Sequence, residues 1–143
     1  MKLELWLPIL TALIAAIGGV LAYARQKKAD RKHELISKRR QAYEGYLFAY
    51  LGSSDTFGKG TPEKLFALNS ARMTVVLIGS DAVVRAVGAL DEYAVRTSVG
   101  EQQLRDPGEF KKRFAVVVLA MRADVFERSQ LNVEEMQNAL PIK

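Results

Sequence analysis

The most apolar part of the sequence lies near its N-terminus, where residues 5–24 read LWLPILTALIAAIGGVLAYA without a charged residue. At about 1.5 Å per residue, a helix of this length spans roughly 30 Å, the thickness of a bilayer's hydrocarbon core. Trp6 and Tyr23 stand near its two ends, where amphipathic rings prefer the headgroup region. The pattern predicts a transmembrane anchor (1–24), followed by a basic juxtamembrane stalk helix (25–42) and a helical bundle (43–143).

Beyond the stalk, apolar residues recur at helical spacing in four segments, which predicts an all-α fold with a bundle of roughly four helices. We expect the stalk to continue into the first of them. The predicted inward positions are Tyr43, Leu47 and Tyr50; Leu65, Leu68, Met73 and Val76; Val83, Val84, Val87, Leu90 and Ala94; and Phe110, Phe114, Val117, Val118, Met121 and Val125. A short last helix is expected from Asn132 until just before Pro141.

Residues with capping preferences predict the helix boundaries. Helix starts are expected at Thr61-Pro62, at Ser80 or Asp81, at Asp106-Pro107 and at Asn132. Asp106 with Glu109 has the spacing of a capping box. Gly79 is predicted to end the second helix in a left-handed conformation, and the third helix is expected to end around residues 98–100.

Two β-branched runs allow a different interpretation. TVVLI (74–78) and AVVVL (115–119) resemble buried strands, and the first could lead through a turn into a helix whose N-terminus binds an anion. Each run, however, continues a helical stripe that begins a turn or more earlier, and two strands make a poor sheet. The helical interpretation is therefore favoured.

The charges are unevenly distributed, although the whole chain carries a net charge of +5. Residues 25–40 hold eight basic and two acidic residues, whereas residues 41–143 are nearly balanced. Positive charge beside a span stays in the cytoplasm, so we expect the bundle in the cytoplasm and the N-terminus outside. The residues expected to meet the anionic inner leaflet are Arg25, Lys27, Lys28, Arg31 and Lys32. A balanced bundle gives no reason to expect binding to nucleic acid.

A cleaved signal peptide is the main alternative to a permanent anchor. Ala22-Tyr23-Ala24 resembles a small-residue cleavage site. The apolar core is nevertheless too long for a signal peptide, and the basic cluster follows it instead of preceding it. The transmembrane interpretation is therefore preferred.

Small residues recur within the predicted anchor. Thr11, Ala15 and Gly19 follow one another at intervals of four, and Gly18 and Ala22 share this spacing. Small residues at such intervals allow two helices to approach closely in lipid. The anchor is therefore expected to favour a homo-oligomer.

Few residues are candidates for chemistry. The chain has no cysteine and a single histidine, His33, which excludes thiolate nucleophiles, zinc–thiolate sites and histidine pairs. No phosphate loop or hydrolase motif is present. Four acids precede an arginine by four residues and are predicted to form intrahelical ion pairs: Asp81/Arg85, Glu92/Arg96, Glu109/Arg113 and Asp124/Arg128. The basic triplet 111–113 is interpreted as a solvated helix face. We therefore predict no catalytic residue, metal site or cofactor.

Three segments carry a resemblance. They are RKHELISKRRQAYEGYLFAYL (31–51), MTVVLIGSDAVVRAVGALDEY (73–93) and FKKRFAVVVLAMRADVF (110–126). Together with the span, they make the chain similar to a broad set of small bacterial membrane-anchored proteins with a basic stalk helix. The resemblance implies a bacterial inner-membrane protein and carries no activity with it. Because the chain has no catalytic motif, the leading hypothesis is a non-enzymatic protein whose bundle binds a protein partner or itself. The alternative is a signal-activated effector of antiphage or mobile-element context, whose oligomerised spans perturb the membrane.

Overall fold

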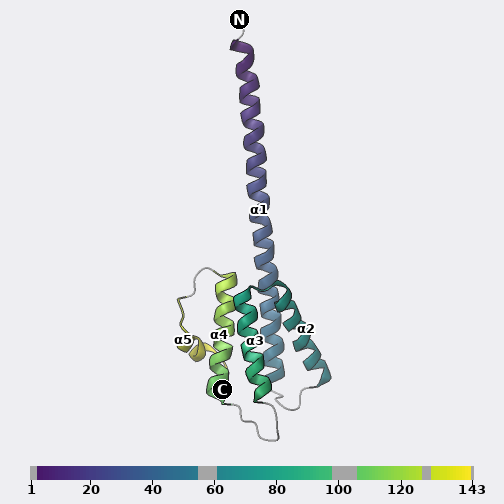
Figure 1. Cartoon of the computed structure of the whole chain (residues 1–143), viewed down its shortest axis with the longest axis vertical. Coiled ribbons are helices and arrows are strands. Elements are labelled where there is room, and N and C mark those ends of the chain that lie inside the picture. Colours follow the sequence, from purple (N-terminus) through teal and green to yellow (C-terminus); the bar gives the residue numbers. More distant parts are fainter. Residues whose placement is uncertain (1–2, 55–60, 98–105, 127–129, 143) are drawn as a thin grey trace. The chain divides into compact units, whose positions relative to one another are not determined.

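The computed structural model describes residues 3–54, 61–97, 106–126 and 130–142, and all regular structure in these ranges is helical. The helices are α1 (Leu3–Ser54), α2 (Pro62–Ile78), α3 (Asp81–Arg96), α4 (Pro107–Val125) and α5 (Val133–Ala139) (Figure 1). The all-α prediction is thus confirmed. Residues 74–78 and 115–119 lie within α2 and α4, so the strand interpretation is wrong.

The chain divides into two compact units, Met1–Ile36 and Ser37–Lys143. The first unit contains only the N-terminal part of α1, which includes Pro8. The Thr11 hydroxyl donates a hydrogen bond of 2.9 Å to the Pro8 carbonyl, within the same helix. Between residues 6 and 35, every side chain that the structure describes is exposed.

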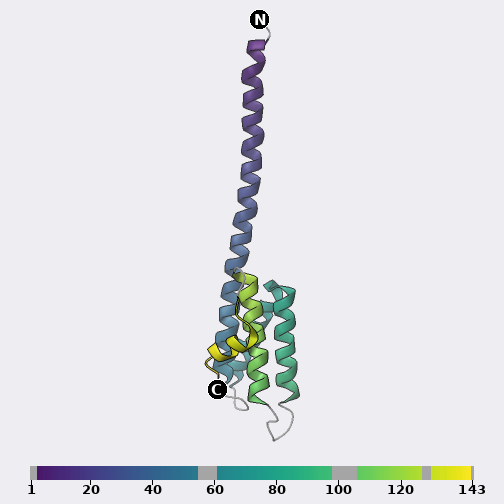
Figure 2. The same ribbon diagram turned by 90° about the vertical axis from the view of Figure 1, so that its left-hand side faces the viewer.

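The second unit is a bundle formed by the C-terminal part of α1 with α2, α3 and α4, and α5 packs against α4 (Figures 1 and 2). Its centre is aromatic, because the Tyr50 ring lies 5.3 Å from the Phe114 ring and 6.1 Å from the Phe110 ring, measured between centroids. The buried core consists of Ala42, Tyr43, Tyr46, Tyr50, Val75, Val83, Val87, Leu90, Phe110, Phe114, Ala115, Val117, Met121 and Met136.

The predicted inward faces are correct for α3 and α4, but of the four residues predicted for α2 only Leu68 packs against the core. Leu65, Met73 and Val76 are 51%, 58% and 44% exposed, whereas Val75 is the residue of α2 that is fully buried. The reason is that α2 is apolar around most of its circumference, so its sequence marks no single inward stripe. The neighbouring helices select the face that carries Leu68, Ala71, Val75 and Ile78.

The capping predictions are confirmed for α5 and only partly for α4. Asn132 and Glu135 form a complete capping box, with bonds of 2.8 and 2.9 Å. Asp106 caps α4 by accepting from the Gly108 N–H, but its own N–H donates to the Tyr93 hydroxyl, so no box forms there. Helix α3 ends at Arg96, before the predicted residues 98–100, which lie outside the described residues.

Gly79 ends α2 in a different way from that predicted. Its φ is −69° and its ψ is 161°, which is extended backbone and not the left-handed region. A glycine is required here because a side chain does not fit. A Cβ at this position would lie 2.6 Å from the Val75 carbonyl oxygen and 3.3 Å from the Tyr43 hydroxyl oxygen. The turn between α2 and α3 is thus held close to α1.

We expect Gly79→Ala to lower the free energy of unfolding by about 1–3 kcal/mol, because the added methyl group must displace backbone. The matched control is Gly88→Ala in α3, where a new Cβ meets nothing within 4 Å. That change should instead raise stability by up to about 1 kcal/mol through helix propensity. Urea unfolding of the two variants, followed by circular dichroism in detergent, measures the difference. Equal midpoints would contradict the close approach at Gly79.

Candidate membrane-facing segment and interaction surface

The first part of α1 exposes large apolar side chains along its length. Eight of them are 53–69% exposed: Trp6, Leu10, Leu13, Ile14, Ile17, Val20, Leu21 and Tyr23. The six aliphatic residues among them recur at helical spacing and lie on one face of the helix. Water is a poor solvent for such a face, and no described residue of the unit Met1–Ile36 covers it.

Within the part of the chain that the structure describes, none of the helices is both long and apolar enough to cross a membrane. The uncharged stretch of the predicted anchor begins at Leu5, and the side chains of Leu5, Leu7 and Ile9 lie outside the described residues. The transmembrane anchor therefore stays a prediction.

The small residues of the predicted anchor gather on the opposite face. Thr11, Ala15, Gly18, Gly19 and Ala22 are all exposed. A Cβ added at Gly18 or Gly19 would meet nothing within 4 Å, so the packing of the chain itself does not require small residues there. The structure thus gives the helix a bulky face and a small face.

The predicted membrane-interface residues also lie on the surface of α1. Trp6, Tyr23, Arg25, Lys27, Lys28, Arg31 and Lys32 are all exposed. The Lys27 ammonium lies 5.8 Å from the centroid of the Tyr23 ring, at the distance of a cation–π contact. This contact places an aromatic ring and a cation together, where the uncharged stretch gives way to the basic one.

A polar cluster that the sequence did not predict joins three helices of the bundle. Arg39 of α1 donates to the Ile78 carbonyl at 2.6 Å and to Asp124 of α4 at 2.9 Å, and the Tyr43 hydroxyl donates to the other oxygen of Asp124. Asp124 was predicted to pair with Arg128, which lies outside the described residues. The sequence positions of Arg39 and Asp124 could have indicated this cluster, because each residue continues an apolar stripe that faces inward.

This Arg39–Tyr43–Asp124 cluster is mostly shielded from water, with side-chain exposures of 23% for Arg39 and 11% for Asp124. Burial and the hydrogen bond to Asp124 raise the pKa of the Tyr43 hydroxyl, which therefore stays a protonated donor at neutral pH. Every member is engaged within the bundle. The arrangement ties the end of α2 and α4 to α1.

A second ion pair connects α2 with α3. The Arg72 Nε lies 2.8 Å from an oxygen of Asp91, and burial raises the pKa of Asp91 while the Arg72 charge opposes the rise. Burial also raises the pKa of the nearby Tyr46 hydroxyl, which has no hydrogen-bond partner among the described residues. Tyr46 is fully enclosed by the bundle, whereas the Arg72 side chain is 43% exposed.

Two of the four predicted intrahelical ion pairs form, Glu92 with Arg96 and Glu109 with Arg113. Arg113 also lies over the Tyr93 ring at 4.9 Å, so one charge of the basic triplet 111–113 is used inside the bundle. Among the described residues, no three side chains of the types that bind metal ions come together. These charges support helices and do not converge on a substrate.

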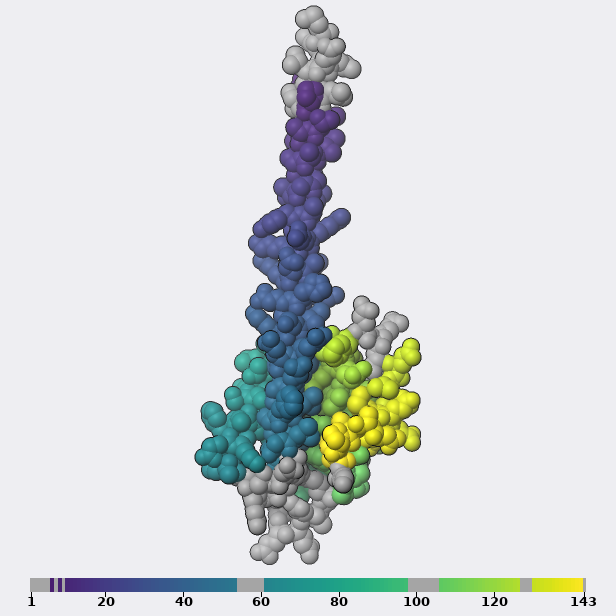
Figure 3. Space-filling view, turned by 180° about the vertical axis from the view of Figure 1, so that it is seen from behind, coloured from purple at the N-terminus to yellow at the C-terminus, as the bar shows by residue number. Residues whose placement is uncertain are grey.

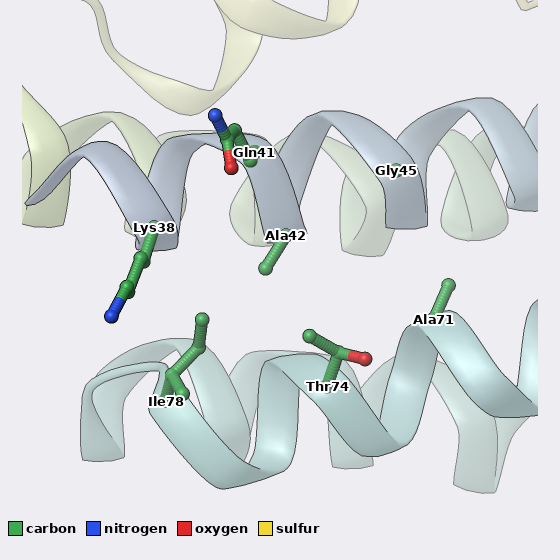
Figure 4. Close-up of a pocket in the computed structure, with 7 residues that line it drawn as sticks. All are labelled: Lys38, Gln41, Ala42, Gly45, Ala71, Thr74 and Ile78. Carbon is green, nitrogen blue, oxygen red and sulfur yellow. The ribbon is translucent and has the colours of Figure 1, made fainter. Parts of the chain in front are cut away.

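The outer face of α2 exposes several large apolar side chains of the bundle. Phe66 and Leu77 are each 77% exposed, and Met73 lies between them on the same face. A groove of about 390 Å³ runs between α2 and α1, and Figure 4 shows Ala42 and Ile78 pointing into it. Small residues line much of this groove, and no set of polar groups converges there to fix a small molecule.

No protein family model, no curated protein and no solved structure matches this chain. The resemblance to small bacterial membrane-anchored proteins therefore stays a prediction. The function is inferred from the residues and their surroundings alone.

Proposed function

We propose that this protein is anchored in the bacterial inner membrane by one span and that its cytoplasmic bundle binds a protein partner or a second copy without catalysing a reaction. The observation that carries the proposal is the uncovered aliphatic face of α1, whose residues are more than half exposed. Removing a leucine or isoleucine side chain from water contributes about 1.5–3 kcal/mol. The transfer of six such side chains from water into lipid would therefore contribute on the order of 10 kcal/mol to membrane insertion.

The two faces of this helix suit two different neighbours. The bulky face, which carries Leu10, Ile14 and Ile17, provides apolar surface for acyl chains. The small face, which carries Ala15 and Gly19, permits the close approach of another helix. This division supports an anchor that also associates with other helices.

The charges support the orientation. Arg25, Lys27 and Lys28 follow the uncharged stretch directly, whereas the charges of Lys2 and Glu4 on its other side cancel. Basic residues beside a span remain cytoplasmic, and each contributes about 1 kcal/mol of attraction to an anionic leaflet. The bundle would then lie beside the inner surface of the membrane.

The bundle itself supports a binding role. Its shielded polar groups, such as Arg39 with Asp124 and Arg72 with Asp91, are occupied in joining helices. Its uncovered feature is apolar, as expected for a surface that another protein covers.

The test is the double variant Ile14→Asp/Ile17→Asp, which places two carboxylates in the middle of the proposed span. Each costs about 2.5–3.5 kcal/mol in the centre of a bilayer, so the chain is expected to move from the carbonate-resistant membrane pellet to the supernatant. The matched control, Ala82→Asp/Ala89→Asp, adds the same charge at exposed positions of α3 and should stay in the pellet. A wild-type chain in the supernatant would refute the anchor.

Single introduced cysteines can report the orientation of the chain, because the native chain has no cysteine that would react in the background. In intact cells, an impermeant maleimide should label Lys2→Cys and should reach His33→Cys only after permeabilisation. The opposite pattern would place the bundle outside. Depolarisation of cells on expression would instead favour the membrane-perturbing effector.

A further inference from the structure

Helix α2 buries less of its surface than its neighbours in the bundle. Val75 is the one residue that it contributes to the buried core, whereas α3 contributes three and α4 contributes five. Figure 1 places α2 at the edge of the bundle, and Figure 3 shows its atoms exposed along one side. A helix that buries little apolar surface gains little free energy from packing, so it is the element that a bundle releases most easily.

The contact between α2 and α1 is also incompletely filled. The groove of about 390 Å³ between these helices is lined in part by Ala42 and Gly45 of α1 and by Ala71 and Thr74 of α2, whose side chains are short or absent (Figure 4). A Cβ added at Gly45 would meet nothing within 4 Å. Atoms on either side of such a gap lose the dispersion contacts that close packing provides. The groove therefore leaves part of α2 without close packing against α1.

Polar contacts of unequal strength hold α2 at its end and near its middle. At the end, the Ile78 carbonyl accepts from Arg39 at 2.6 Å, inside the shielded Arg39–Tyr43–Asp124 cluster. Near the middle, Arg72 pairs with Asp91 of α3 at 2.8 Å, but 43% of the Arg72 side chain is exposed. An ion pair that water reaches contributes little to stability. The C-terminal end of α2 is thus held more firmly than its middle.

A buried hydroxyl beside the weaker contact opposes the closed position of α2. Tyr46 of α1 is 0% exposed, and its hydroxyl lies close to the Arg72–Asp91 pair without a hydrogen-bond partner among the described residues. A hydroxyl that is buried without a partner is less stable than one that water solvates. Movement of α2 away from α3 withdraws Arg72 and opens this site to water.

We propose that α2 is a movable flap of the bundle, which opens about its firmly held end at Gly79 while α1, α3 and α4 stay packed, and that the Tyr46 hydroxyl favours the open state. Opening exposes Val75 and the apolar surface beneath it. The aromatic core does not depend on α2, since its rings belong to α1 and α4. The bundle therefore has a closed and an open form, whose populations a partner can shift. The flap does not depend on the membrane anchor.

Hydrogen exchange of the full-length chain in detergent tests the flap. A helix of 17 residues without its neighbours is only marginally stable, so α2 exchanges its amide protons when it is released. We expect the amides of α2 to be at least tenfold less protected than those of α3 and α4, while circular dichroism shows a folded chain. Equal protection in the three helices would overturn the flap, because the bundle would then open only as a whole.

Two substitutions test what holds the flap and what opens it. Tyr46→Phe removes only the buried hydroxyl and should raise the protection of α2 at least threefold. No rise, or a fall, would overturn the role of the hydroxyl, because it would mean that the group is no better solvated in the open state.

Arg72→Ala should lower the protection of α2 at least threefold, because it removes the contact with Asp91. The matched control is Arg96→Ala, which breaks the exposed pair with Glu92 within α3 and should leave α2 unchanged. Equal effects of the two arginine variants on α2 would show that the Arg72–Asp91 pair does not hold the flap.

Discussion

Phe114→Ala is expected to lower the free energy of unfolding by about 3–5 kcal/mol, because it empties the centre of the aromatic core. Phe114 is 1% exposed, and its ring centroid lies 5.3 Å from that of Tyr50 and 6.4 Å from that of Phe110. These rings belong to α1 and α4, so the cavity would open between the two helices. Urea unfolding of the full-length chain in detergent, followed by circular dichroism, gives the change.

Phe48→Ala is the matched control for this prediction. Phe48 lies on α1, as Tyr50 does, but it is 76% exposed. Its truncation should change stability by no more than about 0.5 kcal/mol. Similar losses for the two variants would mean that the aromatic core does not hold α4 to α1 as described.

Asp124→Ala is expected to cost about 2–4 kcal/mol, because it leaves the Arg39 guanidinium and the Tyr43 hydroxyl without their shared acceptor. Asp124→Asn keeps the shape of the side chain and one acceptor, so a smaller loss of about 1–2 kcal/mol is expected. The same urea experiment measures both variants.

Glu92→Ala serves as the control for Asp124, because it also breaks an ion pair with an arginine but on the solvent-exposed face of α3. Its expected effect is about 0.5 kcal/mol or less. If Asp124→Ala cost no more than Glu92→Ala, the Arg39–Tyr43–Asp124 cluster would not be a structural tie.

Local patterns in the sequence were sufficient for several parts of the fold. Phe110, Phe114, Val117 and Met121 follow one another at intervals of four, three and four, and all are buried, so helical spacing predicted the inward side of α4. Asn132 and Glu135 form their capping box within four residues of the chain. Such features depend on neighbours along the chain and can therefore be recognised without the tertiary structure.

Other parts depended on residues far away in the sequence. Asp124 accepts from Arg39, 85 residues earlier, and not from a position four residues later. Gly79 was read as a left-handed helix end, whereas it is needed because Tyr43 and the Val75 carbonyl lie too close for a side chain. Neither contact produces a periodic pattern in the sequence, so neither could be predicted from it.

The sequence by itself determined the uncharged stretch at 5–24, the basic cluster behind it and the helical character of the remaining chain, because periodicity and charge are properties of neighbouring residues. Only the tertiary structure decided which side of α2 is buried. Both sides are apolar, and the choice of Val75 over Phe66 and Met73 depends on the shape that α1 and α3 present to it. The same choice leaves Phe66, Met73 and Leu77 on the opposite side uncovered, since a helix at the edge of a bundle has neighbours on one side only.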